Sequence, residues 1–290
     1  MTYLYRSPLP TAIAPPVASS YERERSIAES LQLLLLRSHP RQTLPGLAVE
    51  SFYEAALDEA SIGGDSFDAF PLTGNRTALI VADASGKGLE AAERIAEVRF
   101  ALRAFLREHP DPCTALARLN DFVCASQYLS GRDSGTFVTL TLVVLDGATG
   151  EMTCLCAGGE PPLVLRSRGM VKAVPACGAA IGLYPGLSYA SARARLGTGD
   201  TVLLATDGIT EARHFFPGEP HGFCGSSFLG LEGLARLARR ARGNTRPSRA
   251  ASLSLLGKAI FEGARAFGGG AFRDDACLLL VRREAFGDPI

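Results

Sequence analysis

Hydrophobic and polar positions change period along the chain, and each change marks an expected element. Three early segments have the alternation or the short apolar run that is typical of strands: 48–56, 66–72 and 77–81. Apolar side chains then recur at helical spacing over 89–108 and again over 114–128. Pro110 and Pro112 separate these two stretches, because proline ends a helix. The pattern therefore predicts early strands followed by two helices.

The middle of the chain is organised as pairs of strands joined by short turns. The expected pairs are 137–145 with 151–157, 163–166 with 170–174, and 189–196 with 201–205. The first pair is joined by Asp146-Gly-Ala-Thr-Gly150, whose glycines favour a hairpin. Helices return at 230–242 and 250–267, and the strand 276–281 follows them. Antiparallel hairpins with inserted helices predict an α+β sandwich and not a series of βαβ units.

The N-terminal stretch differs in composition from the rest. Residues 1–20 are rich in proline and serine, which predicts a mobile segment. Residues 21–45 are expected to be a helical linker, in which Ile27, Leu31 and Leu35 share one helix face. This helix either packs on the domain that follows or pairs with a second copy as a homodimer, and both arrangements stay open. No later linker interrupts the chain, so 46–285 is expected to be one domain.

Composition narrows the class of partner. The chain of 290 residues carries 30 basic and 30 acidic side chains, so its formal net charge is zero. A zero balance predicts neither a nucleic-acid partner nor binding to an anionic membrane. The seven cysteines form no CxxC pair, and free buried thiols are typical of a reducing cytoplasm. No apolar run has the length of a membrane span or of a signal-peptide core, so we expect a cytoplasmic location.

Four aspartates stand where an apolar run meets a glycine-rich or acidic turn: Asp65, Asp83, Asp207 and Asp274. A carboxylate at the end of a buried strand loses its hydration, which is costly unless a positive charge lies nearby. No basic residue flanks Asp83 or Asp207 on the strand side. A hard cation such as Mg²⁺ or Mn²⁺ is the simplest partner for a set of carboxylates. Gly208, next to Asp207, would let the backbone approach such an ion.

The segment Asp83-Ala-Ser-Gly-Lys-Gly88 has rival interpretations. Its glycines fit a dinucleotide-binding turn, but no parallel strand or ribose-binding acid follows at the expected place. A phosphate loop is excluded because Gly88, and not serine or threonine, follows Lys87. A plain strand–turn–helix corner capped by Ser85 explains the glycines but not the four aspartates together. A two-metal site would use all four.

Five ordered motifs resemble those of metal-dependent protein phosphatases. They are Gly63-Gly64-Asp65-Ser-Phe-Asp68, Asp83-Ala-Ser-Gly-Lys-Gly88, Ala157-Gly-Gly-Glu-Pro-Pro162, Thr206-Asp207-Gly208-Ile-Thr-Glu211 and Asp274-Asp275. The chain looks most like the stage II sporulation protein E branch of the protein phosphatase 2C superfamily, over about residues 21–283. The resemblance implies an αββα sandwich of two mainly antiparallel sheets flanked by helices, with an N-terminal helical extension. It also makes 46–285 the phosphatase domain.

The same resemblance implies two Mn²⁺ or Mg²⁺ ions in a cleft at one edge of the sheets. Asp83 would be the bridging ligand, the Ala84 carbonyl would complete one ion, and Asp65 would serve the first metal. Asp207 and Asp274 would serve the second. A metal-bridging water would attack the phosphorus of phosphoserine or phosphothreonine without a covalent enzyme intermediate. The implied substrate is a phosphorylated anti-anti-sigma factor, a STAS-type partner in a partner-switching pathway.

Some positions depart from the family's pattern or keep two interpretations. Gly159 stands where the family commonly has histidine, and it supports the alternative function of a non-catalytic module that binds and sequesters a partner. Asp68 is expected either to support the ligands or to lie on the surface. Lys87 is either a phosphate contact or a solvated turn lysine. Asp275 competes with Asp274 as a ligand, because a shift of one residue reverses the facing in a strand.

Overall fold

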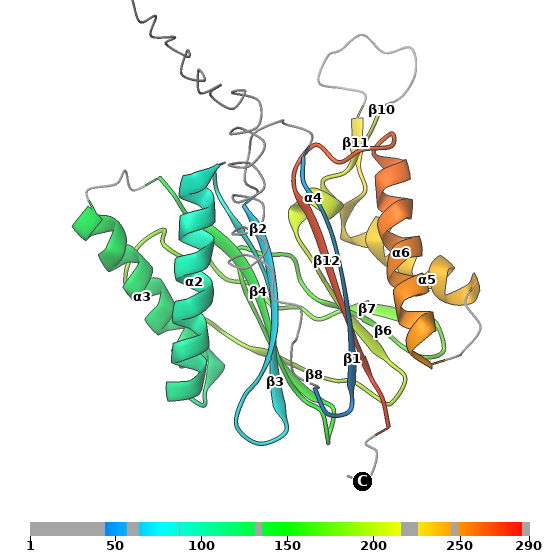
Figure 1. Ribbon diagram of the computed structural model, residues 1–290, viewed down its shortest axis with the longest axis horizontal. Helices are drawn as coiled ribbons and strands as arrows, with labels where there is room; N and C mark the ends of the chain where they lie inside the picture. Colours follow the sequence, from blue (N-terminus) through cyan, green and yellow to red (C-terminus); the bar gives the residue numbers. More distant parts are fainter. Residues whose placement is uncertain are drawn as a thin grey trace, which may run out of the picture.

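The computed structural model describes residues 44–56, 64–86, 88–130, 135–215, 226–244 and 249–285 (Figure 1). The expected mobile segment 1–20, the expected linker up to residue 43, and Lys87 lie outside the described residues. The elements in chain order are β1 (Leu47–Glu54), β2 (Asp65–Pro71), β3 (Arg76–Ala84), α2 (Leu89–Glu108), α3 (Pro112–Ser130), β4 (Val138–Asp146), β5 (Glu151–Ala157), β6 (Leu163–Leu165), β7 (Val171–Ala173), β8 (Ala192–Arg195), β9 (Thr201–Ala205), α4 (Asp207–Thr210), β10 (Arg213–Phe215), β11 (Ser226–Phe228), α5 (Gly230–Asn244), α6 (Arg249–Phe267) and β12 (Ala276–Arg283).

Two five-stranded antiparallel sheets stack face to face. One has the order β2-β3-β4-β5-β8 and is called the β3 sheet below; the other has the order β1-β12-β9-β6-β7 and is called the β12 sheet. Helices α2 and α3 cover the outer face of the β3 sheet, and α5 and α6 cover the outer face of the β12 sheet (Figure 1). The expected α+β sandwich is therefore confirmed. The small β10–β11 pair was not predicted.

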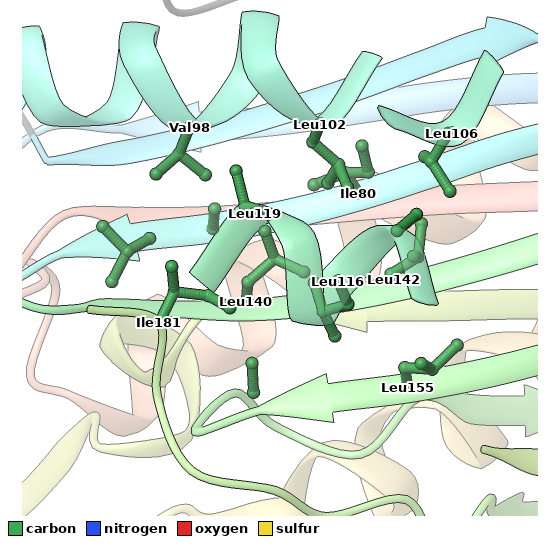
Figure 2. Close-up of a cluster of buried hydrophobic side chains, with 14 of the residues drawn as sticks. Ile80, Val98, Leu102, Leu106, Leu116, Leu119, Leu140, Leu142, Leu155 and Ile181 are labelled. Atoms are coloured by element: carbon green, nitrogen blue, oxygen red, sulfur yellow. The ribbon is translucent and has the colours of Figure 1, made fainter. Parts of the chain in front are cut away.

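Strand β3 shows why the sandwich needs two layers of helix. Its residues are apolar at nearly every position and are buried on both faces. Leu79 and Val81 belong to the core between the two sheets. Ile80 points the other way, into the cluster that Leu102 of α2 and Leu119 of α3 complete (Figure 2). A strand that is apolar on both faces must be covered on both, which the stacked sheet and the helix pair achieve together.

Two of the three expected hairpins are present, β4 with β5 and β6 with β7. The third is wrong, because β8 pairs with β5 in the β3 sheet while β9 pairs with β6 and β12 in the other sheet. The turn 197–200 therefore carries the chain from one sheet to the other. Asp200 Oδ2 stabilises this turn by accepting a 2.9 Å hydrogen bond from the N–H of Gly197. Leu196 and Val202, on either side of the turn, share the inter-sheet core, and their burial outweighs local strand pairing.

Helix α2 begins differently from the expectation. Its N-cap is Gly88, with φ 79° and no side-chain cap. The Ser85 hydroxyl instead accepts a 2.8 Å hydrogen bond from the N–H of Phe137, so it ties this corner to the chain entering β4. Glycine adopts a positive φ at little cost, which explains its presence at the corner.

Two expectations from composition can be compared with the described residues. No helix in this part of the chain combines the length and the apolar character needed to cross a membrane. The described cysteines are free, as expected, and Cys154, Cys156 and Cys277 are buried, whereas Cys113 and Cys124 are half-buried and Cys177 is exposed.

Candidate active site

Strand alternation brings polar side chains together between the two sheets. Asp65 begins β2 and lies opposite Asp83 of β3 in the antiparallel register. Both continue the rows that face the inter-sheet core, which contain Phe67 in β2 and Val81 in β3. Thr206 follows β9 and continues the corresponding row of the β12 sheet. The three polar residues therefore come together at one edge of the sandwich.

Thr206 joins the two sheets at this edge. Its hydroxyl donates a 2.6 Å hydrogen bond to Asp65 Oδ2 and accepts one of 2.9 Å from the N–H of Cys277. The N–H of Thr206 also donates to the Cys277 carbonyl (3.0 Å). Asp65 is only 2% exposed, so the threonine hydroxyl replaces water that the carboxylate has lost. Sequence reasoning assigned no role to Thr206, although its place directly before Asp207 was a usable signal.

The aspartates at this edge raise one another's pKa. The pKa of Asp83 rises from 3.8 to about 7, first because of burial and then because of the charges of Asp207 and Asp274. The pKa of Asp65 is raised well above its usual value, again by burial first and then by the charge of Asp83. Burial also raises the pKa of Asp207, followed by the charges of Glu211 and Asp274. Negative charge therefore collects at this edge, where burial and the neighbouring acids raise the three pKa values more than hydrogen bonds lower them.

Asp274 and Asp275 have different surroundings. Asp275 Oδ1 accepts a 2.9 Å hydrogen bond from the N–H of Ala56, just after β1. Asp274 Oδ1 accepts only the N–H of its neighbour, Asp275 (3.0 Å). The charge of Asp274 raises the pKa of both Asp83 and Asp207, and for Asp83 it acts more strongly than the charge of Asp275. The charge of Asp275, in turn, raises the pKa of Asp65, so both acids act on this edge.

Two glycines leave no room for a side chain beside these acids. A Cβ on Gly64 would lie 2.8 Å from the Ala84 carbonyl oxygen and 2.9 Å from Asp83 Oδ1. A Cβ on Gly208 would lie 1.8 Å from the Asp275 carbonyl oxygen. Gly64 therefore lets the backbone approach the Ala84 carbonyl and Asp83 closely, and Gly208 lets the helix that carries Asp207 pack directly on the chain before β12.

The donor atoms fit a hard divalent cation in their chemistry. Within the described residues, no three histidine, cysteine, aspartate or glutamate side chains are arranged so that they could hold a metal ion as they stand. The expected ligand atoms are nevertheless all oxygens, which is the set that Mg²⁺ and Mn²⁺ select. Two of them, Asp83 Oδ1 and the Ala84 carbonyl oxygen, lie within 3 Å of the position that a Cβ of Gly64 would occupy. The acids must turn further toward a common point to complete such a site.

Asp68 faces away from this edge. Its Oδ2 accepts hydrogen bonds from Arg99 Nε (3.1 Å) and Arg103 Nε (2.6 Å), and its Oδ1 accepts one from Arg103 Nη2 (2.7 Å). Asp68 is 1% exposed, so the interpretation as a surface residue is wrong. Its charge is neutralised by α2, whereas Asp65, on the opposite face of the same strand, meets further acids.

Gly159 lies against β4 without space for a side chain. A Cβ here would lie 2.6 Å from Thr141 Oγ1 and 2.9 Å from the carbonyl carbon of Leu140. A histidine at this position would therefore have to displace the backbone of β4. The departure from the family's pattern is matched by the packing around it.

Glu160 lies beside Gly159 and connects β4 with the helix that begins at Asp207. The Glu160 carbonyl accepts a 2.8 Å hydrogen bond from the Thr141 hydroxyl, and Glu160 Oε1 accepts one of 2.7 Å from the Thr210 hydroxyl in α4. A cavity of about 300 Å³ opens here, and its polar lining includes Thr139, Thr141, Glu160, Thr206, Asp207 and Glu211. Sequence reasoning noted Glu160 only as an acid next to the Gly159 position.

Solved structures with the same fold identify the class of protein. The SiaA-PP2C domain of Pseudomonas aeruginosa matches with a TM-score of 0.68 at 19% identity, over 92% of this chain and 98% of that one. The RsbU and RsbW domains of Rv1364c from Mycobacterium tuberculosis match with a TM-score of 0.67 at 28% identity, over 85% of this chain and 62% of that one. The fold is that of the PP2C-type phosphatases, as the ordered motifs indicated.

The family follows from the sequence match. Residues 73–284 match the family described as Stage II sporulation protein E (SpoIIE), and the chain belongs to that family. Protein IcfG from Synechocystis sp. is 27% identical over 176 residues, which are 53% of this chain and 28% of IcfG. The chain therefore spans less than a third of that curated relative and less than two thirds of the Rv1364c chain. The expected resemblance is confirmed at the level of the family.

Proposed function

We propose that this chain is a Mn²⁺- or Mg²⁺-dependent protein serine/threonine phosphatase. The observation that carries the proposal is the gathering of Asp65, Asp83 and Asp207 at one edge, where burial and mutual repulsion raise their pKa values. Asp68, by contrast, is paired with two arginines. A divalent cation would remove the repulsion among these acids. RsbX, which shares the fold with a TM-score of 0.55 at 14% identity, has been solved in complex with magnesium.

The proposed ligands of two ions are Asp65, Asp83, the Ala84 carbonyl, Asp207 and Asp274. Bound cations would supply positive charge and activate water for attack on phosphorus. In the reaction the water oxygen bonds to phosphorus and the ester P–O bond breaks, which releases inorganic phosphate and the free serine or threonine hydroxyl. The chain's own part is to hold its carboxylates in place. Thr206 orients Asp65, and Gly208 allows α4 to pack where Asp207 faces the other acids.

The proposed substrate is a phosphorylated STAS-type partner of the anti-anti-sigma class, recognised at the 46–285 phosphatase domain. The solved Rv1364c structure contains an RsbU domain together with an RsbW domain, and this chain is 28% identical to it. The polar cavity beside Asp207 offers space at the same edge for a group that carries phosphate. The chain covers only part of the relatives that support this substrate, so the substrate needs a direct test.

A homodimer through the helix that the sequence predicts within residues 21–45 is also proposed. The apolar face of Ile27, Leu31 and Leu35 is the support for it. Removal of residues 1–40 is expected to lower the mass in light scattering from dimer to monomer. An unchanged mass would indicate that this helix packs on its own domain.

Turnover with controlled metal tests the catalytic proposal. Hydrolysis of p-nitrophenyl phosphate and of a phosphoserine peptide should require Mn²⁺ or Mg²⁺ and stop with a chelator. Asp83→Asn and Asp207→Asn should each lose at least about a hundredfold in turnover. Asp121→Asn, which changes an exposed acid of α3, is the matched control and should retain activity. Undiminished, metal-independent hydrolysis by Asp83→Asn would overturn the proposal.

The alternative function is a phosphatase-fold module that binds a partner without hydrolysis, and the packing of Gly159 is what favours it. If the wild-type chain binds a phosphorylated STAS domain but releases no phosphate with either metal, the sequestering function is supported. Phosphate release at a rate that depends on the metal supports the phosphatase function instead.

A further inference from the structure

A groove lined by arginines and by apolar atoms lies at the far end of the β12 sheet from the carboxylates. The turn between β6 and β7 and the last turns of α5 enclose a groove of about 690 Å³. Its described lining residues are Ser167, Arg168, Gly169, Met170, Val171, Arg239, Arg242 and Gly243. Leu165 of β6 pairs with Thr201, at the start of β9, whereas Asp207 follows the end of β9. The groove is therefore about 20 Å from the carboxylate edge, measured along the strand.

The groove is basic, and the acid bonded to its lining, Asp200, is engaged by other groups. None of the described lining residues is acidic. Asp200 is 5% exposed and is already satisfied by Arg166 Nη1 (2.8 Å) and the N–H groups of Ser167 (2.7 Å) and Gly197 (2.9 Å). Three of the roughly four acceptor positions of the Asp200 carboxylate are therefore occupied, and its ion pair is with Arg166, which is not part of the lining.

The three arginines of the groove, Arg168, Arg239 and Arg242, differ in their exposure and in their hydrogen bonds. Arg242 is fixed by hydrogen bonds from its Nε (3.3 Å) and Nη2 (3.1 Å) to the Ser167 carbonyl. Arg168 and Arg239 are exposed, and their guanidinium groups form no ion pair with any residue that the structure describes. Arg282 is buried close by, and the charge of Arg242 adds to burial in lowering its pKa. Positive charge is therefore in excess here, although the whole chain is neutral.

We propose that this groove docks a carboxylate-rich, extended segment of a protein partner. Arg168, Arg239 and Arg242 provide the fork-shaped donors that carboxylates match. Met170, 61% exposed, provides an apolar contact for a neighbouring side chain of the segment.

The other features of the groove favour a peptide over a nucleic acid. Strand β7 is the last strand of the β12 sheet, and no described strand pairs with its outer edge, so an extended peptide has backbone groups to meet there. A nucleic acid would need phosphate contacts that repeat along its backbone, and the groove supplies one short cluster.

Binding of a fluorescent oligoglutamate peptide that contains one leucine tests the proposal by fluorescence anisotropy. The full chain should bind it, and affinity should fall as salt is raised, because the contact is ionic. Arg168→Glu/Arg239→Glu should weaken binding by about tenfold or more, since two attractive charges become repulsive. Arg168→Gln/Arg239→Gln, a milder change at the same exposed positions, keeps the test valid if the charge reversal unfolds the chain. Arg236→Glu is the matched control, because Arg236 is exposed on the same helix and pairs with Glu232 outside the groove.

Each outcome decides the proposal. Retained binding in Arg236→Glu together with loss in either double variant supports the groove. Absence of binding by the wild type, or equal weakening by Arg236→Glu, overturns it. Tighter, arginine-dependent binding of an oligothymidylate or of anionic vesicles would reassign the groove to nucleic acid or membrane. Hydrolysis of p-nitrophenyl phosphate is expected to be unchanged in the double variants, so this test is independent of the catalytic proposal.

Discussion

Neutralising Asp83 should stabilise the metal-free protein while removing its proposed activity. The pKa of Asp83 is raised from 3.8 to about 7, so ionising it in the fold costs up to about 4 kcal/mol more than ionising it in the unfolded chain. In the Asp83→Asn variant the side chain carries no charge, and repulsion from Asp207 and Asp274 disappears. The amide still has to be buried and loses part of its contact with Asp65, so we expect a net gain of about 2 kcal/mol above neutral pH.

The sign of the pH dependence follows from the same shift. Between about pH 4 and pH 7 the folded metal-free protein keeps a proton on Asp83 that the unfolded chain releases. The free energy of unfolding therefore falls as pH rises through this window and levels off above the folded pKa. Asp83→Asn lacks this slope, so the variant should differ little from wild type near pH 4 and should be the more stable protein near pH 8.

Urea unfolding in the presence of a chelator measures this difference at each end of the window. Asp121→Asn, in an exposed position of α3, is the control and should follow the wild type at both pH values. A variant less stable than wild type near pH 8, or a difference that does not depend on pH, would refute the account of an uncompensated carboxylate cluster. Saturating Mn²⁺ should reverse the order, because only the wild type gains stability from binding.

Three further substitutions test the packing around the site, each by urea unfolding. Gly208→Ala should lower the free energy of unfolding by about 3 kcal/mol or more, because the added Cβ would lie 1.8 Å from the Asp275 carbonyl oxygen. If the variant is as stable as wild type, α4 does not pack against this carbonyl. Asp68→Asn should lower the free energy of unfolding by about 3 kcal/mol, because it breaks the ion pair of the buried Asp68 with Arg103. This effect is opposite in sign to that of Asp83→Asn, and a stabilised variant would contradict the pairing. Gly159→His should lower the free energy of unfolding by about 2 kcal/mol, because the larger side chain overpacks against β4. An unchanged urea midpoint would show that β4 can shift to accommodate the side chain.

The fold was largely predictable because its strands are strongly patterned. Strand β3 and its neighbours are apolar on both faces, which required cover on both sides, and the helices on either side of the meander supplied it. The third hairpin failed because a short glycine turn looks the same whether it reverses a chain within one sheet or passes it to the next. Only the burial of Leu196 and Val202 in the shared core decided between the two.

The acids of the candidate site were also predictable from the sequence. Asp65, Asp83, Asp207 and Asp274 were singled out because charge at the end of an apolar strand needs an explanation, and the structure brings their charges into mutual repulsion. Their roles as metal ligands stay predictions, and Lys87 lies outside the described residues. The place of Thr206 directly before Asp207 was a signal in the sequence, but its bond to Asp65 across the two sheets is visible only in the fold.

The sequence by itself determined the class of fold, the family and the list of acids, because alternation, glycine turns and strand-end charges are local properties that survive without a structure. The tertiary structure decided which charges are compensated. Asp68 and Asp65 stand three residues apart on one strand, yet opposite faces give one two arginines and the other more acids. The arginines around the β6–β7 turn come from segments about 70 residues apart, so their joint groove exists only once α5 packs against that turn.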